Sequence, residues 1–108
     1  MNPLEIAQQI AELTQENSKG ADALYEAEVE LANAENNLDL IEQKAFIRSQ
    51  GTVADRTALA RLEAAQARLD RDLAKAKANR IKTKIKALET AIMAAATQAK
   101  LIQSEMKL

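Results

Sequence analysis

A run of basic side chains in the second half of the chain is the clearest candidate for binding chemistry. Residues 75–86 contain six lysines and arginines and no acidic residue. Such a surface could contact a phosphate backbone, because each neutralised phosphate releases counterions. An ordinary solvated helix face is the alternative, since no aromatic residue lies nearby to stack bases. With one base from the preceding turn, the candidate nucleic-acid-binding residues are Arg71, Lys75, Lys77, Arg80, Lys82, Lys84 and Lys86.

The chain lacks the residue types on which most catalytic and metal sites depend. It has no Cys and no His, which excludes thiolate or imidazole metal ligands and the usual nucleophile pairs. We therefore expect no enzymatic activity, no cofactor and no small-molecule substrate. No apolar run approaches the roughly 20 residues of a membrane span. The N-terminus has no basic region followed by an apolar one, so we expect a cytoplasmic protein without a membrane partner.

The composition predicts an all-α fold. Apolar residues make up 47% of the 108 residues, but 23 of them are alanine and only Tyr25 and Phe46 are aromatic. Alanine, glutamate, lysine, leucine, arginine and glutamine dominate, and these residues lose least on entering a helix. Two glycines and one proline leave little material for turns.

A heptad pattern predicts a first helix over about residues 3–50. Asn2 before Pro3 indicates a helix cap followed by proline at the first helical position. Apolar spacing that alternates between four and three over five heptads is typical of a coiled coil. Residues 17–20 have poor helix propensity, and we favour a continuous or kinked helix there over a short first helix that folds back. Asn17 either sets the coiled-coil register or belongs to a break. The inward positions are Ile6, Ile10, Leu13, Asn17, Gly20, Leu24, Ala27, Leu31, Ala34, Leu38, Ile41 and Ala45.

Gly51 marks the turn of a long antiparallel helical hairpin. Glycine can adopt the left-handed conformation that ends helices. Thr52 and Asp55 then stand at the spacing of a helix cap, with Asp in place of Glu. We therefore expect a turn at 51–52 and a second helix over about residues 53–106. Its predicted inward residues are Leu62, Leu69, Leu73, Ala76, Ile81, Ile85, Leu88, Ile92, Ala95, Ala99, Ile102 and Met106, with a phase shift between Leu73 and Ile81.

The two halves of the chain carry opposite charge. Residues 1–50 have a net charge of −7 and residues 51–108 a net charge of +6. If the chain folds back at 51.5, between residues 51 and 52, acids of the first helix meet bases of the second. Both sets recur every seven residues, as charged flanking positions of coiled coils do. These bases form either an internal ladder of ion pairs, which we favour, or a stripe for nucleic acid. The predicted pairs are Glu42 with Arg61, Glu35 with Arg68, and Glu28 with Lys75.

Two helices of about 50 residues with this much alanine would bury little core by themselves. We therefore expect a homo-oligomer in which several hairpins share a core.

Three segments resemble small helical proteins of tailed bacteriophages that are encoded near recombination and replication genes. They are residues 24–28 (Leu-Tyr-Glu-Ala-Glu), residues 51–56 (Gly-Thr-Val-Ala-Asp-Arg) and residues 61–70. The layout over roughly residues 20–105 is similar to UvsY-type recombination mediators. The resemblance implies an oligomer that binds single-stranded DNA, here through the bases of the second helix, and that helps to load a recombinase past single-strand-binding protein. Against tight DNA binding stand the slightly acidic net charge and the scarcity of aromatic residues.

Two function classes therefore stay open. The first is a recombination accessory protein that contacts single-stranded DNA, a recombinase or single-strand-binding protein. The second is a structural or adaptor coiled coil that binds only protein.

Overall fold

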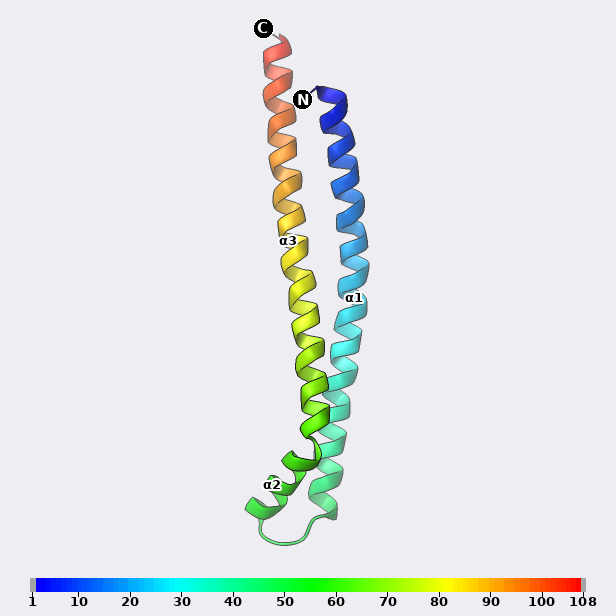
Figure 1. Ribbon diagram of the computed structural model, residues 1–108, viewed down its shortest axis with the longest axis vertical. Helices are drawn as coiled ribbons and strands as arrows, with labels where there is room; N and C mark the ends of the chain where they lie inside the picture. Colours follow the sequence, from blue (N-terminus) through cyan, green and yellow to red (C-terminus); the bar gives the residue numbers. More distant parts are fainter. Residues whose placement is uncertain (1, 108) are drawn as a thin grey trace. The chain divides into compact units, whose positions relative to one another are not determined.

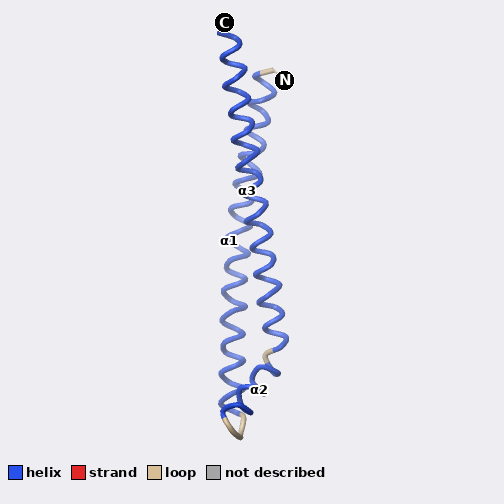
Figure 2. The backbone as a smooth tube through the Cα atoms, turned by 90° about the vertical axis from the view of Figure 1, so that its left-hand side faces the viewer, coloured by secondary structure: helices blue, strands red, loops and turns tan. Residues whose placement is uncertain are grey.

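The computed structural model describes residues 2–107, and these residues form three helices without a strand. Helix α1 spans Pro3–Arg48, α2 spans Val53–Glu63 and α3 spans Ala65–Lys107. The chain divides into two compact units: unit 1 joins Met1–Leu24 to Arg80–Leu108, and unit 2 is Tyr25–Asn79. Within each unit a part of α1 lies beside a part of α3 and runs in the opposite direction (Figures 1 and 2). The predicted all-α helical hairpin is confirmed.

Helix α1 begins at the predicted cap. The Oδ1 atom of Asn2 accepts a hydrogen bond of 2.8 Å from the backbone N–H of Glu5, and the Glu5 carboxylate accepts one of 3.4 Å from the backbone N–H of Asn2. These reciprocal bonds satisfy donors that a helix start leaves open. The helix then runs unbroken through residues 17–20. Every inward position predicted for this helix is buried or half-buried, so the heptad register of α1 is correct.

The second helix differs from the prediction of one helix over residues 53–106. Helix α2 ends at Glu63 and α3 begins at Ala65, with Ala64 between them at φ −88° and ψ 6°. The backbone N–H of Ala64 still donates to the carbonyl of Ala60, and the Ala64 carbonyl accepts from the N–H of Arg68. The chain therefore bends at Ala64 while keeping these two backbone hydrogen bonds, and α2 leaves the line of α3 (Figure 1).

The inward face of the second half differs from the prediction over residues 62–76 and at Met106, whereas every predicted inward residue from Ile81 to Ile102 is buried or half-buried. Leu62, Leu69 and Leu73 have exposed fractions of 73%, 51% and 61%, Met106 is 72% exposed, and Ala76 is exposed as well. Small side chains occupy the seam instead. The buried residues of α2, the bend and α3 are Ala60, Ala64, Ala67, Ala74, Ala78 and Ala95.

This alanine seam continues the isoleucine register without the predicted phase shift. From Ala78 the spacing runs to Ile81, Ile85 and Leu88 in steps of three, four and three, and all four residues are buried or half-buried. Alanine fits such a seam because helices with small contact residues approach closely. In unit 1, a Cβ atom placed on Gly20 of α1 would lie only 3.1 Å from Cγ1 of Ile85.

Candidate nucleic-acid interface

The turn in unit 2 sets where α2 and α3 begin. Gly51 has φ +115°, a conformation that side-chain-bearing residues rarely adopt. The Oγ1 atom of Thr52 accepts a 3.1 Å hydrogen bond from the N–H of Asp55, so the predicted N-terminal cap of α2 is present. The Asp55 carboxylate packs beneath the glycine, because a Cβ atom at Gly51 would lie 3.3 Å from Asp55 Oδ2.

Arg56 holds the end of α1, a role that the sequence analysis did not assign. Its Nε and Nη2 atoms donate hydrogen bonds of 3.1 and 3.0 Å to the carbonyl of Phe46. Its guanidinium also lies 4.1 Å from the centroid of the Phe46 ring. A cation suits the last turn of a helix, where carbonyls lack partners. The available signal was the position of Arg56 at the end of the turn motif that begins at Gly51.

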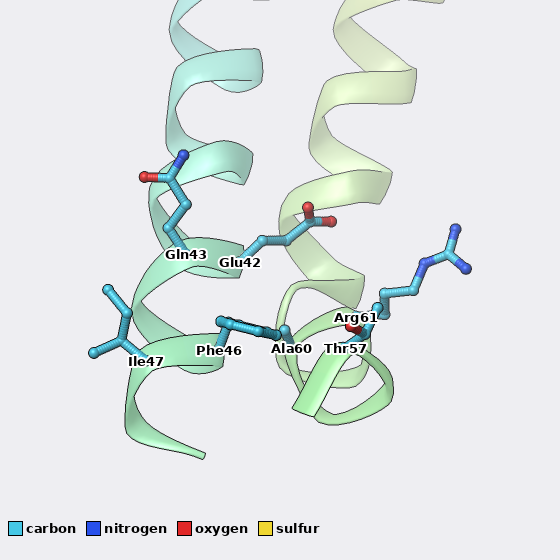
Figure 3. A pocket seen from close by; sticks show the side chains of 7 residues that line it. All are labelled: Glu42, Gln43, Phe46, Ile47, Thr57, Ala60 and Arg61. Carbon is cyan, nitrogen blue, oxygen red and sulfur yellow. The ribbon is translucent and has the colours of Figure 1, made fainter. Parts of the chain in front are cut away.

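A groove of about 470 Å³ lies between α1 and α2 in unit 2. Figure 3 shows Phe46 reaching from α1 towards Ala60 and Thr57 of α2, with the Arg61 side chain extending away from them. The groove has an apolar floor and no convergent acid, base or nucleophile. The residues that line it are Glu42, Gln43, Phe46, Ile47, Thr57, Ala60 and Arg61.

The ion pairs of unit 2 correct two of the predicted pairs. Glu42 pairs with Arg68 at 3.2 Å, in place of the predicted pairs of Glu42 with Arg61 and of Glu35 with Arg68. The partner of Glu42 thus lies one heptad later than a fold at 51.5 requires. The reason is that α2 leaves the line of α3, so that the chain uses more residues before it returns along α1.

Two further ion pairs reach across unit 2 from α1. Arg48 pairs with Glu63 of α2 at 2.8 Å, and Glu30 pairs with Lys77 of α3 at 3.0 Å. All four side chains are at least half-exposed, and such pairs contribute only about 0.2–1 kcal/mol each. An internal ladder therefore exists in another register, and the predicted pair of Glu28 with Lys75 is not part of it, because Lys75 has no ion-pair partner among the described residues.

Three of the candidate nucleic-acid-binding residues belong to unit 2. Arg71 occupies a half-buried seam position, and its Nε donates to Oδ1 of the adjacent Asp72 at 2.7 Å. Lys77 is engaged with Glu30. Lys75 is exposed and forms no ion pair with the described residues. Intramolecular acids therefore neutralise part of this charge.

The other four candidates belong to unit 1 and are all exposed: Arg80, Lys82, Lys84 and Lys86. Arg80 and Lys84 lie one helical turn apart, so they share one face of α3. Within residues 2–107, no carboxylate lies within ion-pair distance of Arg80, Lys84 or Lys86. These three cations keep their charge available to a ligand.

Lys84 also borders a groove of about 430 Å³ in unit 1, opposite Gly20. Its walls combine two cations and one acid with the apolar seam, and the residues that line it are Glu16, Lys19, Gly20, Ala23, Ile81, Lys84, Ile85 and Leu88.

Other kinds of site find no support in the described part of the chain. No three side chains among Asp and Glu gather there to hold a metal ion. None of the described helices combines the length and the apolar character that crossing a membrane requires. Comparisons with protein-family models, curated proteins and solved structures find no match to this chain.

Proposed function

We propose that this chain is a bacteriophage-encoded accessory protein of DNA recombination, which binds single-stranded DNA as a homo-oligomer. The observation that supports it most directly is the group of three exposed cations, Arg80, Lys84 and Lys86, without a carboxylate partner in unit 1. Phosphates of a DNA backbone are natural ligands for such cations, because counterion release drives their binding. The resemblance to UvsY-type mediators supports the single-stranded form of the ligand.

The protein partner in this proposal is a RecA-like recombinase or a single-strand-binding protein, acting with the chain on the same DNA. The chain itself has a positioning role and no catalytic step. Its contribution would be to hold the DNA strand along α3 while the recombinase replaces single-strand-binding protein on the DNA.

The test is a titration with a fluorescently labelled single-stranded oligonucleotide at several salt concentrations. Each phosphate contact to single-stranded DNA contributes about 0.7 to the slope of log K against log salt. A triple variant with Arg80→Glu, Lys84→Glu and Lys86→Glu is therefore expected to lower the slope by about 2. Circular dichroism verifies that the variant keeps its helices.

Lys100→Glu is the matched control, because Lys100 lies exposed on the same helix and in the same unit but outside the basic segment. Its expected effect on the slope is small. Wild-type binding that does not depend on salt, or equal effects of the control and the triple variant, would refute the DNA-binding proposal.

A structural or adaptor coiled coil that binds only protein is the second candidate. The exposed leucines Leu62, Leu69 and Leu73 favour it, since large exposed apolar side chains mark protein-binding surfaces. An oligomer that shows no affinity for single-stranded DNA at low salt would favour this candidate.

A further inference from the structure

In unit 2, α3 presents apolar side chains on two opposite faces. Ala67, Ala74 and Ala78 are buried in the seam with α1. Leu69 and Leu73 lie one turn apart on the other side and are more than half exposed. We call Leu69, Leu73 and Ala76 the outer face of α3. A helix that is apolar all round is usually covered all round.

The distribution of side-chain size points the same way. In unit 2, alanines fill the α3 side of the seam, and Leu69 and Leu73, with much more apolar surface to bury, face outward. If α3 packed only against α1, leucines in the seam and alanines outside would bury more apolar surface and give more stability. The outer face therefore has the composition of a second seam.

The charges beside the outer face indicate what covers it. Asp70 and Lys77 are seven residues apart, so they occupy the same heptad position on one edge of this face. An antiparallel copy of α3, related by a two-fold axis near Leu73, would place Asp70 opposite Lys77 of the second copy, and Lys77 opposite its Asp70. In a parallel copy, this edge would face the opposite edge of the partner helix, so Asp70 and Lys77 would not meet across the interface.

Both charged side chains are accessible for this role. Asp70 accepts a 2.9 Å hydrogen bond from Nε2 of Gln66 on its own helix. Lys77 contacts Glu30 through a pair in which both side chains are more than half exposed. Each side chain thus lies exposed at the protein surface beside the leucines.

We propose that a second copy of this chain packs on the outer face, α3 against antiparallel α3, about a two-fold axis near Leu73. This is an isologous interface, in which one surface patch is complementary to itself. The inference rests on the self-assembly in the proposed function and adds its surface, its partner and its symmetry. It does not depend on DNA binding.

A charge swap tests the pairing of Asp70 with Lys77. Sedimentation equilibrium at low salt measures the dissociation constant of the wild type, of Asp70→Lys, of Lys77→Asp and of the double variant. Each single change creates like-charge contacts and is expected to weaken association about tenfold. The double variant restores opposite charges and is expected to recover most of the affinity. Glu30→Gln is the control, because it removes only the intramolecular partner of Lys77.

A cysteine placed near the axis tests the geometry independently. The chain has no cysteine, so Leu73→Cys introduces a single thiol. Close to a two-fold axis, the two copies of this residue can approach within the 7 Å between Cα atoms that a disulfide allows. Mild oxidation is expected to give a covalent dimer. Leu40→Cys, at an exposed position of α1 in the same unit, is expected to stay largely uncrosslinked.

The outcomes separate this interface from the proposed function. If the wild type associates but Asp70→Lys leaves its dissociation constant unchanged, the interface is overturned and self-assembly stands. The same conclusion follows if the double variant does not recover the wild-type affinity. A wild type that is monomeric at all concentrations overturns both the interface and the self-assembly. DNA binding is decided separately by the triple variant at Arg80, Lys84 and Lys86.

Discussion

Replacing Leu38 by alanine tests the assignment of the seam in unit 2. Leu38 is 6% exposed and packs with Ala64 and Ala67, and Ile41 lies against the same cluster. It is the only leucine among the buried residues of the described chain. Removing three carbons costs about 0.8 kcal/mol per carbon in transfer free energy, and the cavity left behind adds to this. We expect Leu38→Ala to lower the free energy of unfolding by about 3 kcal/mol.

Leu40→Ala is the matched control, because it makes the same substitution two residues along the same helix. Leu40 is 45% exposed, so the change removes much less buried surface, and alanine is a slightly better helix former. We expect a loss below about 1 kcal/mol. The difference between the two variants, near 2 kcal/mol, measures the value of the seam position.

Urea denaturation followed by circular dichroism, at one fixed protein concentration, gives both values. The concentration must be held constant because association of copies would add to the apparent stability. Equal losses for the two variants, or a larger loss at Leu40, would refute the seam assignment. A total stability of about 5–15 kcal/mol is usual for a domain, so a 3 kcal/mol effect is easily measured.

Three further predictions concern the turn in unit 2 and a seam position in unit 1. Gly51→Ala places a side chain on a backbone with φ +115° beside Asp55, a strained conformation. It is expected to lower the urea midpoint by the equivalent of about 1–2 kcal/mol, and an unchanged midpoint would contradict the strain. Thr52→Ala removes the cap of α2 and is expected to cost about 1 kcal/mol in thermal unfolding, with Thr52→Ser recovering most of it. Asn17→Leu replaces a side chain whose Oδ1 is buried without a hydrogen-bond partner, so it is expected to raise the melting temperature; a decrease would show that this oxygen is satisfied in solution.

The sequence was sufficient to predict α1 in detail. Its seam contains Ile6, Leu31 and Leu38, so large apolar residues mark the heptad positions that alanine alone would leave ambiguous. Asn2 and Pro3 stand at recognisable positions of a helix start. Gly51 and Thr52 likewise located the turn, because each occupies a backbone position with a strong residue preference.

The face of the second half was mispredicted because side-chain size was taken to indicate burial. Leu69 and Leu73 are the largest apolar residues of their segment, yet they face away from α1. Extending the spacing of Ile81 and Ile85 backwards in strict heptads leads to Ala78 and Ala74, which are the buried residues. The pattern was present, but alanine occurs so often in this chain that its periodicity is hard to distinguish from its background.

The basic residues of the candidate site could be identified from the sequence. Which of them form intramolecular ion pairs, and which remain available to a ligand, could not. The bend at Ala64 has no glycine or proline to signal it. It nevertheless decides that Arg68 contacts Glu42, because it displaces α2 from the line of α3. Ion pairing depends on this register, so only the structure separates the engaged Lys77 from the available Lys84.

The placement of both ends of the described chain in unit 1 has a mechanical consequence. A force applied between handles at the two ends would pull the antiparallel helices apart in unzipping geometry, which loads one layer of side chains at a time. The buried alanines, almost all of which lie in unit 2, offer few atoms to resist each step. We expect saw-tooth rupture forces that begin in unit 1, fall at the alanine layers of unit 2 and reach the layer of Leu38 late. A hairpin built this way yields gradually to tension at its ends, while the turn at Gly51 is the last point to feel the load.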